Sequence, residues 1–297
     1  MIEFSRTYRA RLLLAPFIAT SALIAACAKA PVPEVATPAP AAVEPVTPAA
    51  AIDGLSNEFH ESFAKADARA RAVTYWMQCV ATVQRLRSTG TFGASASAPR
   101  GLFCERTGDG VPVGGVYDID STYRVIRRLS VVRLDGSRPK YTDALDTARI
   151  ARAAKLARDV SKSITPVWTK KNHPFSVVPV VVGDVVEAWV MPRANKSRSF
   201  VTGGDVGYTG AGETAPTVIE DRSATWTQLT LPATGALTIY SSVRDVAAVA
   251  DLVTARYQHD LGREVTVSTP AATSTLVAGL DSTTGARIVW KHTPRKP

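Results

Sequence analysis

The sequence predicts an α+β fold that combines a mixed or antiparallel sheet with about three helices. Two valine-rich runs separated by the pair Gly183-Asp184 indicate a β-hairpin. Three segments with the apolar spacing of helices flank it. A strand, a helix and a strand follow one another near residues 237–268, which is the size of a parallel βαβ unit, although a split α+β arrangement fits equally well.

The first helix is expected over residues 56–87, where apolar residues recur at alternating steps of four and three. Asn57 and Glu58 open this segment, and Gly90 lies just beyond its end. The apolar stripe can dock on the chain's own sheet or form a coiled-coil seam with a partner. Its members are Phe59, Phe63, Ala66, Ala70, Val73, Met77 and Val80.

Strands are expected between and after the first two helices. They cover residues 101–105, 113–118, 123–134, 177–182 and 185–190. The valines of the last two strands are continuous rather than alternating, so both faces of their sheet are expected to be covered. Pro179 interrupts one of these strands, which indicates a sheet edge or a bulge there.

The second helix is expected over residues 142–163. Its expected buried side consists of Leu145, Ala148, Leu156 and Val160. Cations that step by three or four residues form a stripe along the same helix and a candidate partner-binding surface. They are Arg149, Arg152, Lys155, Arg158 and Lys162.

The remaining segments are shorter. Residues 193–217 contain five glycines and are expected to form a long mobile loop or a ragged hairpin. A third helix is expected after a cap at Ser242, with Val246, Val249, Val253 and Tyr257 on its apolar side and Gly262 at its end. Further strands are expected at residues 224–231, 237–240, 264–268 and 286–291.

The N-terminus has the pattern of an export signal. Three arginines between positions 6 and 11 precede an apolar run of about 15 residues, which is shorter than the roughly 20 that a spanning helix needs. The residues Ile24-Ala25-Ala26-Cys27 resemble the lipobox of bacterial lipoproteins, in which the cysteine is acylated and becomes the new N-terminus. The resemblance implies a removed signal peptide at residues 1–26 and a membrane anchor on Cys27. Ala28, rather than an aspartate, favours the periplasmic face of the outer membrane. The alternative is an ordinary secretory signal with an incidental cysteine.

Residues 27–54 are expected to hold the lipidated cysteine and a tether rich in proline and alanine. Proline blocks helix continuation, so residues 28–52 are expected to be extended, with an upper reach of roughly 75 Å at about 3.1 Å per residue. Residues 55–297 are then expected to form a single α+β globular domain.

The charge of the chain belongs to that domain. The formal net charge is +9. Residues 1–27 carry three arginines against one glutamate, and residues 28–54 carry one lysine against three acids, so their charges of +2 and −2 cancel. A basic exported domain suits an acidic protein surface or anionic lipid as its partner, whereas nucleic acid is not expected outside the cytoplasm. An arginine-rich surface that serves only solubility is the alternative.

Two cysteines remain once Cys27 is assigned to lipid. An even pair in an oxidising compartment predicts a disulfide between Cys79 and Cys104, which would fasten the first helix to the strand that follows. Two separately buried thiols are the alternative. A metal site is not expected, because neither cysteine has a Cys or His neighbour at ligand spacing.

No local motif indicates catalysis, a metal or a cofactor. The histidines at positions 60, 173, 259 and 292 form no metal-binding pair, and no Gly-x-Ser-x-Gly elbow is present. The run Gly203-Gly204-Asp205-Val206-Gly207 lacks the Gly-Lys-Ser/Thr ending of a phosphate-binding loop, so a flexible loop is favoured.

Three functions are compatible with the sequence. The preferred one is a membrane-anchored, non-catalytic accessory or structural subunit of a larger envelope complex. The second is a binding module for lipid, glycan or peptidoglycan that uses residues 203–212 as a lid. The third is a hydrolase whose site is assembled from distant residues, with His259 as its base.

Overall fold

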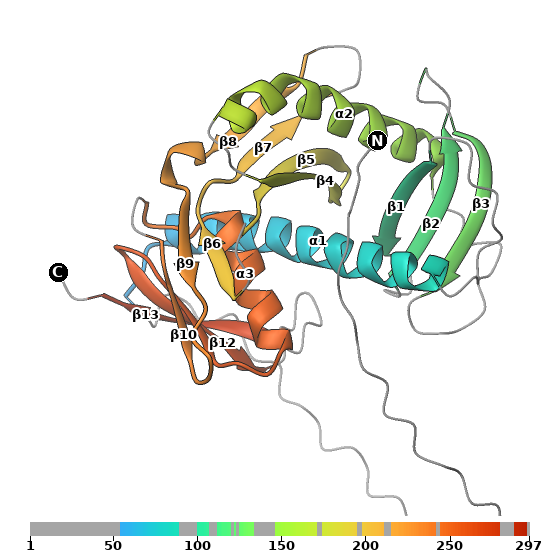
Figure 1. Cartoon of the computed structure of the whole chain (residues 1–297). Helices are drawn as coiled ribbons and strands as arrows, with labels where there is room; N and C mark the ends of the chain where they lie inside the picture. Colours follow the sequence, from blue (N-terminus) through green and yellow to red (C-terminus); the bar gives the residue numbers. More distant parts are fainter. Residues whose placement is uncertain are drawn as a thin grey trace, which may run out of the picture. The chain divides into compact units, whose positions relative to one another are not determined.

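The computed structural model describes residues 54–88, 100–106, 112–119, 122, 125–133, 146–170, 174–194, 198–210, 215–241, 244–279 and 288–295. All of them belong to the compact unit Pro45–Pro297. The predicted α+β class is confirmed, since these ranges contain three α-helices and both mixed and antiparallel sheets (Figure 1). The expected signal peptide, Cys27 and the tether lie outside the described residues.

The elements follow one another in an irregular order of helices and strands. The helices are α1 (Asn57–Ser88), α2 (Thr147–Lys170), α3 (Val249–Asp260) and the short 3-10 helix η2 (Ser223–Thr225). The first strands are β1 (Arg100–Arg106), β2 (Pro112–Ile119), β3 (Val125–Arg133), β4 (Phe175–Val182), β5 (Val185–Pro192), β6 (Ser199–Thr202) and β7 (Val206–Thr209). The last are β8 (Thr217–Asp221), β9 (Thr227–Thr230), β10 (Leu237–Tyr240), β11 (Val265–Ser268), β12 (Ala272–Ala278) and β13 (Ile288–Pro294).

The valine hairpin lies in the middle of three layers. Its strands β4 and β5 belong to the sheet β4-β5-β7-β8, with α1 on one face and α2 on the other (Figure 1). Trp189 and Met191 join the core that contains α1, whereas Ala188 and Val190 join the core that contains α2. Successive residues of a strand point to opposite faces, so continuous apolar residues fill both cores and the predicted double coverage is confirmed.

Pro179 lies on an edge strand, as predicted. β4 is the outermost strand of its sheet, and its ladder with β5 runs without a register shift. Arg193 donates its N–H to the carbonyl of Pro174 at 2.8 Å, so the even-numbered residues of β4 face β5 and the backbone of Pro179 faces the open edge. No ladder hydrogen bond is lost there, which is why the strand tolerates proline.

A second sheet contains the predicted βαβ unit. Its order is β10-β11-β12-β13, and β10 pairs in parallel with β11 through α3. Ile239, Val267 and Leu276 face the core that α1 and α3 also line. The apolar stripe of α1 therefore docks on the chain's own sheets, from Phe59, at 5% exposure, to Val73, which is fully buried.

Buried carboxylates fasten α1 to its neighbours. Asp67 on α1 accepts hydrogen bonds from Arg71 at 2.7 Å, from Arg256 of α3 at 3.0 Å and from the indole of Trp290 of β13 at 2.7 Å. Because Asp67 is only 3% exposed, these donors replace the water that its charge has lost. One carboxylate thus joins three elements that are distant in the sequence.

Glu187 has the same role between α1 and the middle sheet. It accepts from Arg69 of α1 at 3.1 Å and from the indole of Trp189 at 2.7 Å. The Arg69 guanidinium also lies 5.6 Å from the ring centre of Trp189. The side chain of Trp189 is therefore held by packing in the core, by its hydrogen bond to Glu187 and by its contact with the Arg69 guanidinium.

Several predicted boundaries and faces were wrong. α2 runs to Lys170, seven residues beyond the expected end. At its start, Asp146 caps the helix by accepting the N–H groups of Ala148 and Arg149 at 2.9 and 3.2 Å. Ala148 therefore lies in the first turn, and it is exposed rather than buried. α3 begins at Val249 and leaves Tyr257 51% exposed. On α1, Met77 is 44% exposed.

Residues 193–217 were expected to form a long mobile loop or a ragged hairpin, and the hairpin alternative is confirmed, since β7 pairs in antiparallel with β8. β6 and β12 were not predicted as strands. β6 lies within that range, and β12 follows the expected strand at residues 264–268. The stretch 201–207 is buried, so it is not a lid as expected. β6 and β7 have only four residues each, which is too short for an alternating pattern to be recognised. Among the described helices, none is long and apolar enough to cross a membrane.

Candidate functional site

The predicted cationic stripe lies on the face of α2 that points away from the core. The opposite face packs against the middle sheet through Ile150, Ala153, Leu156, Val160 and Ile164. Arg152, Arg158 and Lys162 are exposed, and half-buried Lys155 pairs with Asp159 at 2.8 Å. We call Arg152, Lys155, Arg158 and Lys162 the cationic face.

Arg149 does not belong to this face. It is half-buried and lies four residues before Ala153, which is fully buried. Residues four apart share one side of a helix, so Arg149 lies on the buried side of α2. Four of the five residues expected in the stripe therefore lie on this face.

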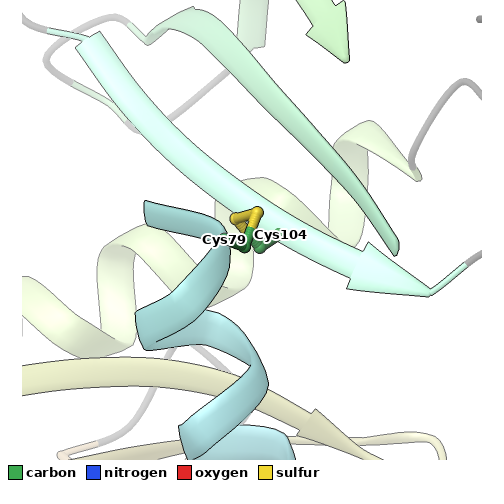
Figure 2. Close-up of a disulfide and its surroundings, with 2 residues drawn as sticks. All are labelled: Cys79 and Cys104. Atoms are coloured by element: carbon green, nitrogen blue, oxygen red, sulfur yellow. A yellow bond between two sulfur atoms is a disulfide. The ribbon is translucent and has the colours of Figure 1, made fainter. Parts of the chain in front are cut away.

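The predicted disulfide is present. Cys79 of α1 and Cys104 of β1 are joined with their Cα atoms 6.2 Å apart (Figure 2). Both cysteines are buried, at 0% and 7% exposure. The bond fastens the first helix to the following strand and is structural. Cys27, the predicted lipidation site, lies outside the described residues.

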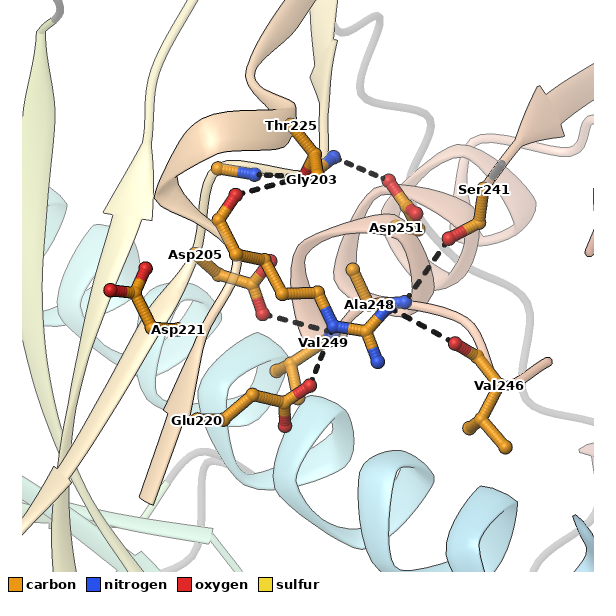
Figure 3. A network of polar contacts seen from close by, with 12 residues as sticks. Gly203, Asp205, Glu220, Asp221, Thr225, Ser241, Val246, Ala248, Val249 and Asp251 are labelled. Atoms are coloured by element: carbon orange, nitrogen blue, oxygen red, sulfur yellow. Dashed lines mark hydrogen bonds and ion pairs between the residues drawn. The ribbon is translucent and has the colours of Figure 1, made fainter. Parts of the chain in front are cut away.

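A network of buried polar groups surrounds the beginning of α3 (Figure 3). It starts at the turn between β6 and β7, where Gly203 and Gly204 have φ angles of 60° and 82°. A Cβ on Gly204 would lie 2.8 Å from the Trp226 ring, so this turn requires glycine. Gly203 donates its N–H to Asp251 at 2.8 Å, and Gly204 donates to the Thr225 hydroxyl at 3.3 Å.

Asp205 caps α3 from a distant part of the chain. Its Oδ2 accepts the N–H of Val249 at 3.1 Å, while its Oδ1 has no hydrogen-bond partner among the described residues. The side chain is fully buried. Burial, followed by the charges of Asp251 and Glu220, raises the pKa of Asp205 to about 7. Burial also raises the pKa of Asp251.

Arg222 is the cation of the network. Its Nε donates to Glu220 at 2.6 Å, and its terminal nitrogen donates to the carbonyl of Val246 at 3.1 Å. Its own carbonyl accepts the N–H of Gly204 at 3.1 Å and the Thr225 hydroxyl at 2.8 Å. The residue therefore links the end of β8 to the segment that leads into α3.

The network lines a cavity of about 290 Å³. The cavity lies between β9 and β10, which are consecutive along the chain but pair with different sheets. Its buried polar residues are Thr202, Arg222, Ser241 and Asp251, and its exposed apolar residues are Leu229 and Tyr240. Gly203, Thr225, Thr227 and Ala248 complete the lining.

A second cavity, of about 310 Å³, lies beside the disulfide. Tyr75, Trp76, Val180 and Val181 give it a largely apolar wall. Among its described lining residues, the charged one, Arg71, is paired with Asp67 at 2.7 Å. More of the described residues that line the first cavity have polar side chains.

Two of the described histidines, His60 and His292, pack together, and His259 lies half-buried in the last turn of α3. His60 and His292 lie 5.7 Å apart, between ring centres, in an aromatic cluster with Phe59 and Phe63. His292 hydrogen-bonds across two strands to Ser274 at 2.8 Å, but Ser274 is only 1% exposed, which leaves its hydroxyl out of reach of a substrate. Within the described ranges, no three His, Cys, Asp or Glu side chains are grouped to hold a metal ion.

The polar network was not predicted. Asp205 was assigned to a flexible loop, and Asp251 and Arg222 were assigned no role, because their partners are 44, 48 or 24 residues away in the sequence. No family model, curated protein or solved structure matches the chain. The function is therefore inferred from the chain's own residues.

Proposed function

We propose that the protein is a membrane-anchored envelope lipoprotein that acts as a non-catalytic accessory or structural subunit of a larger membrane-associated complex. The observation that carries the proposal is the cationic face of α2, which points outward from a helix whose other side is buried. The lipobox-like residues ending at Cys27 supply the anchor.

The cationic face suits an acidic partner surface. Arg152, Arg158 and Lys162 are exposed and do not belong to the core that holds α2 in place. Several like charges on one rigid helix create a local positive potential within a chain whose net charge is already +9. Such a potential steers an acidic protein surface into register and rejects basic ones.

The segment before the domain favours action at a membrane. Lipid on Cys27 would contribute about 0.8 kcal/mol for each buried methylene group, so several acyl chains hold firmly. A proline-rich tether with an upper reach of roughly 75 Å lets the domain meet a partner well above the bilayer. Anchoring also raises the effective concentration of the domain near a partner in the same membrane.

The test is cross-linking in native membranes followed by purification of the full-length chain. The variant R152E/R158E/K162E reverses the three exposed charges of the cationic face. The control K65E/R244E/K291E makes the same change in net charge at three exposed cations outside α2. We expect wild type and control to retain one partner at low salt, and the α2 variant to retain about tenfold less of it.

Two further arms complete the test. Cys27→Ser should release the chain from the membrane fraction and abolish acylation. Recovery of monomer alone from the wild type at both low and high salt, or equal recovery of the partner with both triple variants, would contradict the proposal.

A further inference from the structure

We propose that the cavity between β9 and β10 binds a neutral, polyhydroxylated ligand, namely a sugar residue of a glycan. This site is separate from the cationic face of α2. It uses the side chains of Arg222, Ser241, Asp251, Thr227 and Tyr240.

The charges of the cavity favour a neutral ligand. Arg222 and Asp251 both line it, at 7% and 1% exposure. These two charged lining residues have opposite signs: an anion would meet the carboxyl group of Asp251, and a cation would meet the guanidinium of Arg222. Neither sign is therefore favoured, whereas a neutral polar group can bond to either side chain.

The hydrogen-bonding groups match those of a sugar. Five of the lining side chains carry a hydroxyl group: Thr202, Thr225, Thr227, Tyr240 and Ser241. A hydroxyl can both donate and accept, as can each hydroxyl of a sugar ring, and those of Thr225 and Ser241 already make one or more hydrogen bonds within the network. Arg222 adds donors and Asp251 adds acceptors, so a ligand whose groups do both can satisfy the whole lining.

The rim supplies an apolar surface beside these polar groups. Tyr240 is 64% exposed and Leu229 is 38% exposed, and they lie on the two strands that border the cavity. A sugar ring has polar edges and a less polar face, and an exposed tyrosine offers a flat surface with a polar tip. The volume of about 290 Å³ is at the lower end of the range for small-molecule sites, which suits a single ring.

The polar floor is already fixed in place. Asp251 is held by the N–H of Gly203 at 2.8 Å, and the Ser241 hydroxyl accepts the N–H of Ala248 at 3.4 Å. Arg222 is held by Glu220 at 2.6 Å. A ligand would therefore not have to order these side chains, and less of its binding free energy would be lost.

The experiment measures binding of four monosaccharides to the full-length protein in detergent by ligand-observed NMR. Glucose and N-acetylglucosamine are the neutral probes, glucosamine is the cationic one, and glucuronic acid is the anionic one. We expect saturable binding of at least one neutral probe, with about tenfold weaker binding of both charged probes. Pelleting with insoluble neutral glycan strands, such as chitin, then distinguishes a polymeric source from free sugar.

The variant Tyr240→Ala tests whether the ligand binds in this cavity. It removes an exposed side chain rather than a buried one. It should weaken the neutral sugar about tenfold. Tyr257→Ala, at a tyrosine that is 51% exposed on α3 and does not line the cavity, is the matched control and should leave binding unchanged. The triple variant on α2 should also bind the sugar normally. The proposal is overturned by preference for a charged probe, by equal effects of the two tyrosine variants, or by no saturable binding of either neutral probe or the glycan strands.

Discussion

Individual buried carboxyl groups connect segments of this chain that are distant in the sequence. Asp205 and Asp251 use backbone N–H groups as partners, and each reaches a residue more than 40 positions away. Their roles depend on tertiary contacts, so nothing in the local sequence distinguishes them from solvent-exposed aspartates. Of the histidines that the sequence does single out, His60 and His292 pack in an aromatic cluster.

The raised pKa of Asp205 predicts a pH-dependent stability. Its ordinary value of 3.8 applies to the unfolded chain, and its value in the fold is about 7. Between these values only the folded chain holds the proton, so this group makes the free energy of unfolding fall as pH rises, by up to about 1.4 kcal/mol per pH unit. Denaturant unfolding of wild type and Asp205→Asn from pH 4 to 8 measures the effect.

The amide of Asp205→Asn keeps an oxygen that can accept the N–H of Val249, but it cannot ionise. Its slope between pH 4 and 7 should therefore be smaller than that of the wild type, with the remainder coming from groups such as Asp251, whose pKa is also raised. Identical slopes in the two proteins would show that Asp205 does not titrate in this range.

At the scale of elements, periodic segments were predictable and tertiary boundaries were not. The α1 stripe and the valine hairpin have strong local patterns, and Pro179 even identified an edge strand. The start of α3 was misplaced: its N-cap residue is Ala248, and Asp205 accepts the N–H of Val249. The predicted cap, Ser242, lies outside the described residues. The cationic face was predictable from spacing alone, apart from Arg149, whereas the cavity needs two strands that pair with different sheets.

Among the contacts between elements, we expect those of Asp67 to be the ones whose loss lowers the free energy of unfolding most. Asp67→Ala would leave the side chains of Arg71, Arg256 and Trp290 without their common acceptor. Breaking a buried ion pair from one side typically costs about 3–5 kcal/mol in the free energy of unfolding. Denaturant unfolding at neutral pH measures this cost.

Asp159→Ala is the matched control, because it breaks the Lys155 pair on the surface of α2. That loss should cost under about 1 kcal/mol. Similar costs for the two variants would mean that Asp67 does not join α1, α3 and β13 as the structure indicates.

The disulfide should stabilise the attachment of β1 to α1. Closing a loop between Cys79 and Cys104, which are 25 residues apart, is worth roughly 3–4 kcal/mol in the chain-entropy model. The double variant Cys79→Ser/Cys104→Ser should unfold at correspondingly lower denaturant concentration than the oxidised protein. A variant as stable as the oxidised wild type would show that the bond adds nothing to the packing around it.

At the scale of the whole described unit, α1 is the common element. It has 32 residues and is therefore about 48 Å long, and it contacts α3, β4, β1 and β2. The middle sheet separates the core shared with α1 from the core shared with α2. Among the described residues of α2, the exposed cations Arg152, Arg158 and Lys162 lie on the side that faces away from these cores.

Site-specific photo-cross-linking in native membranes tests the docking role of α2 most directly. A photoreactive residue is placed at position 152 or 162 on the cationic face, and at position 65 on α1 as the control, since Lys65 is also exposed. We predict one protein adduct from both α2 positions that weakens as salt rises, and no such adduct from position 65. An adduct that forms equally from all three positions, or from none, would contradict docking through α2.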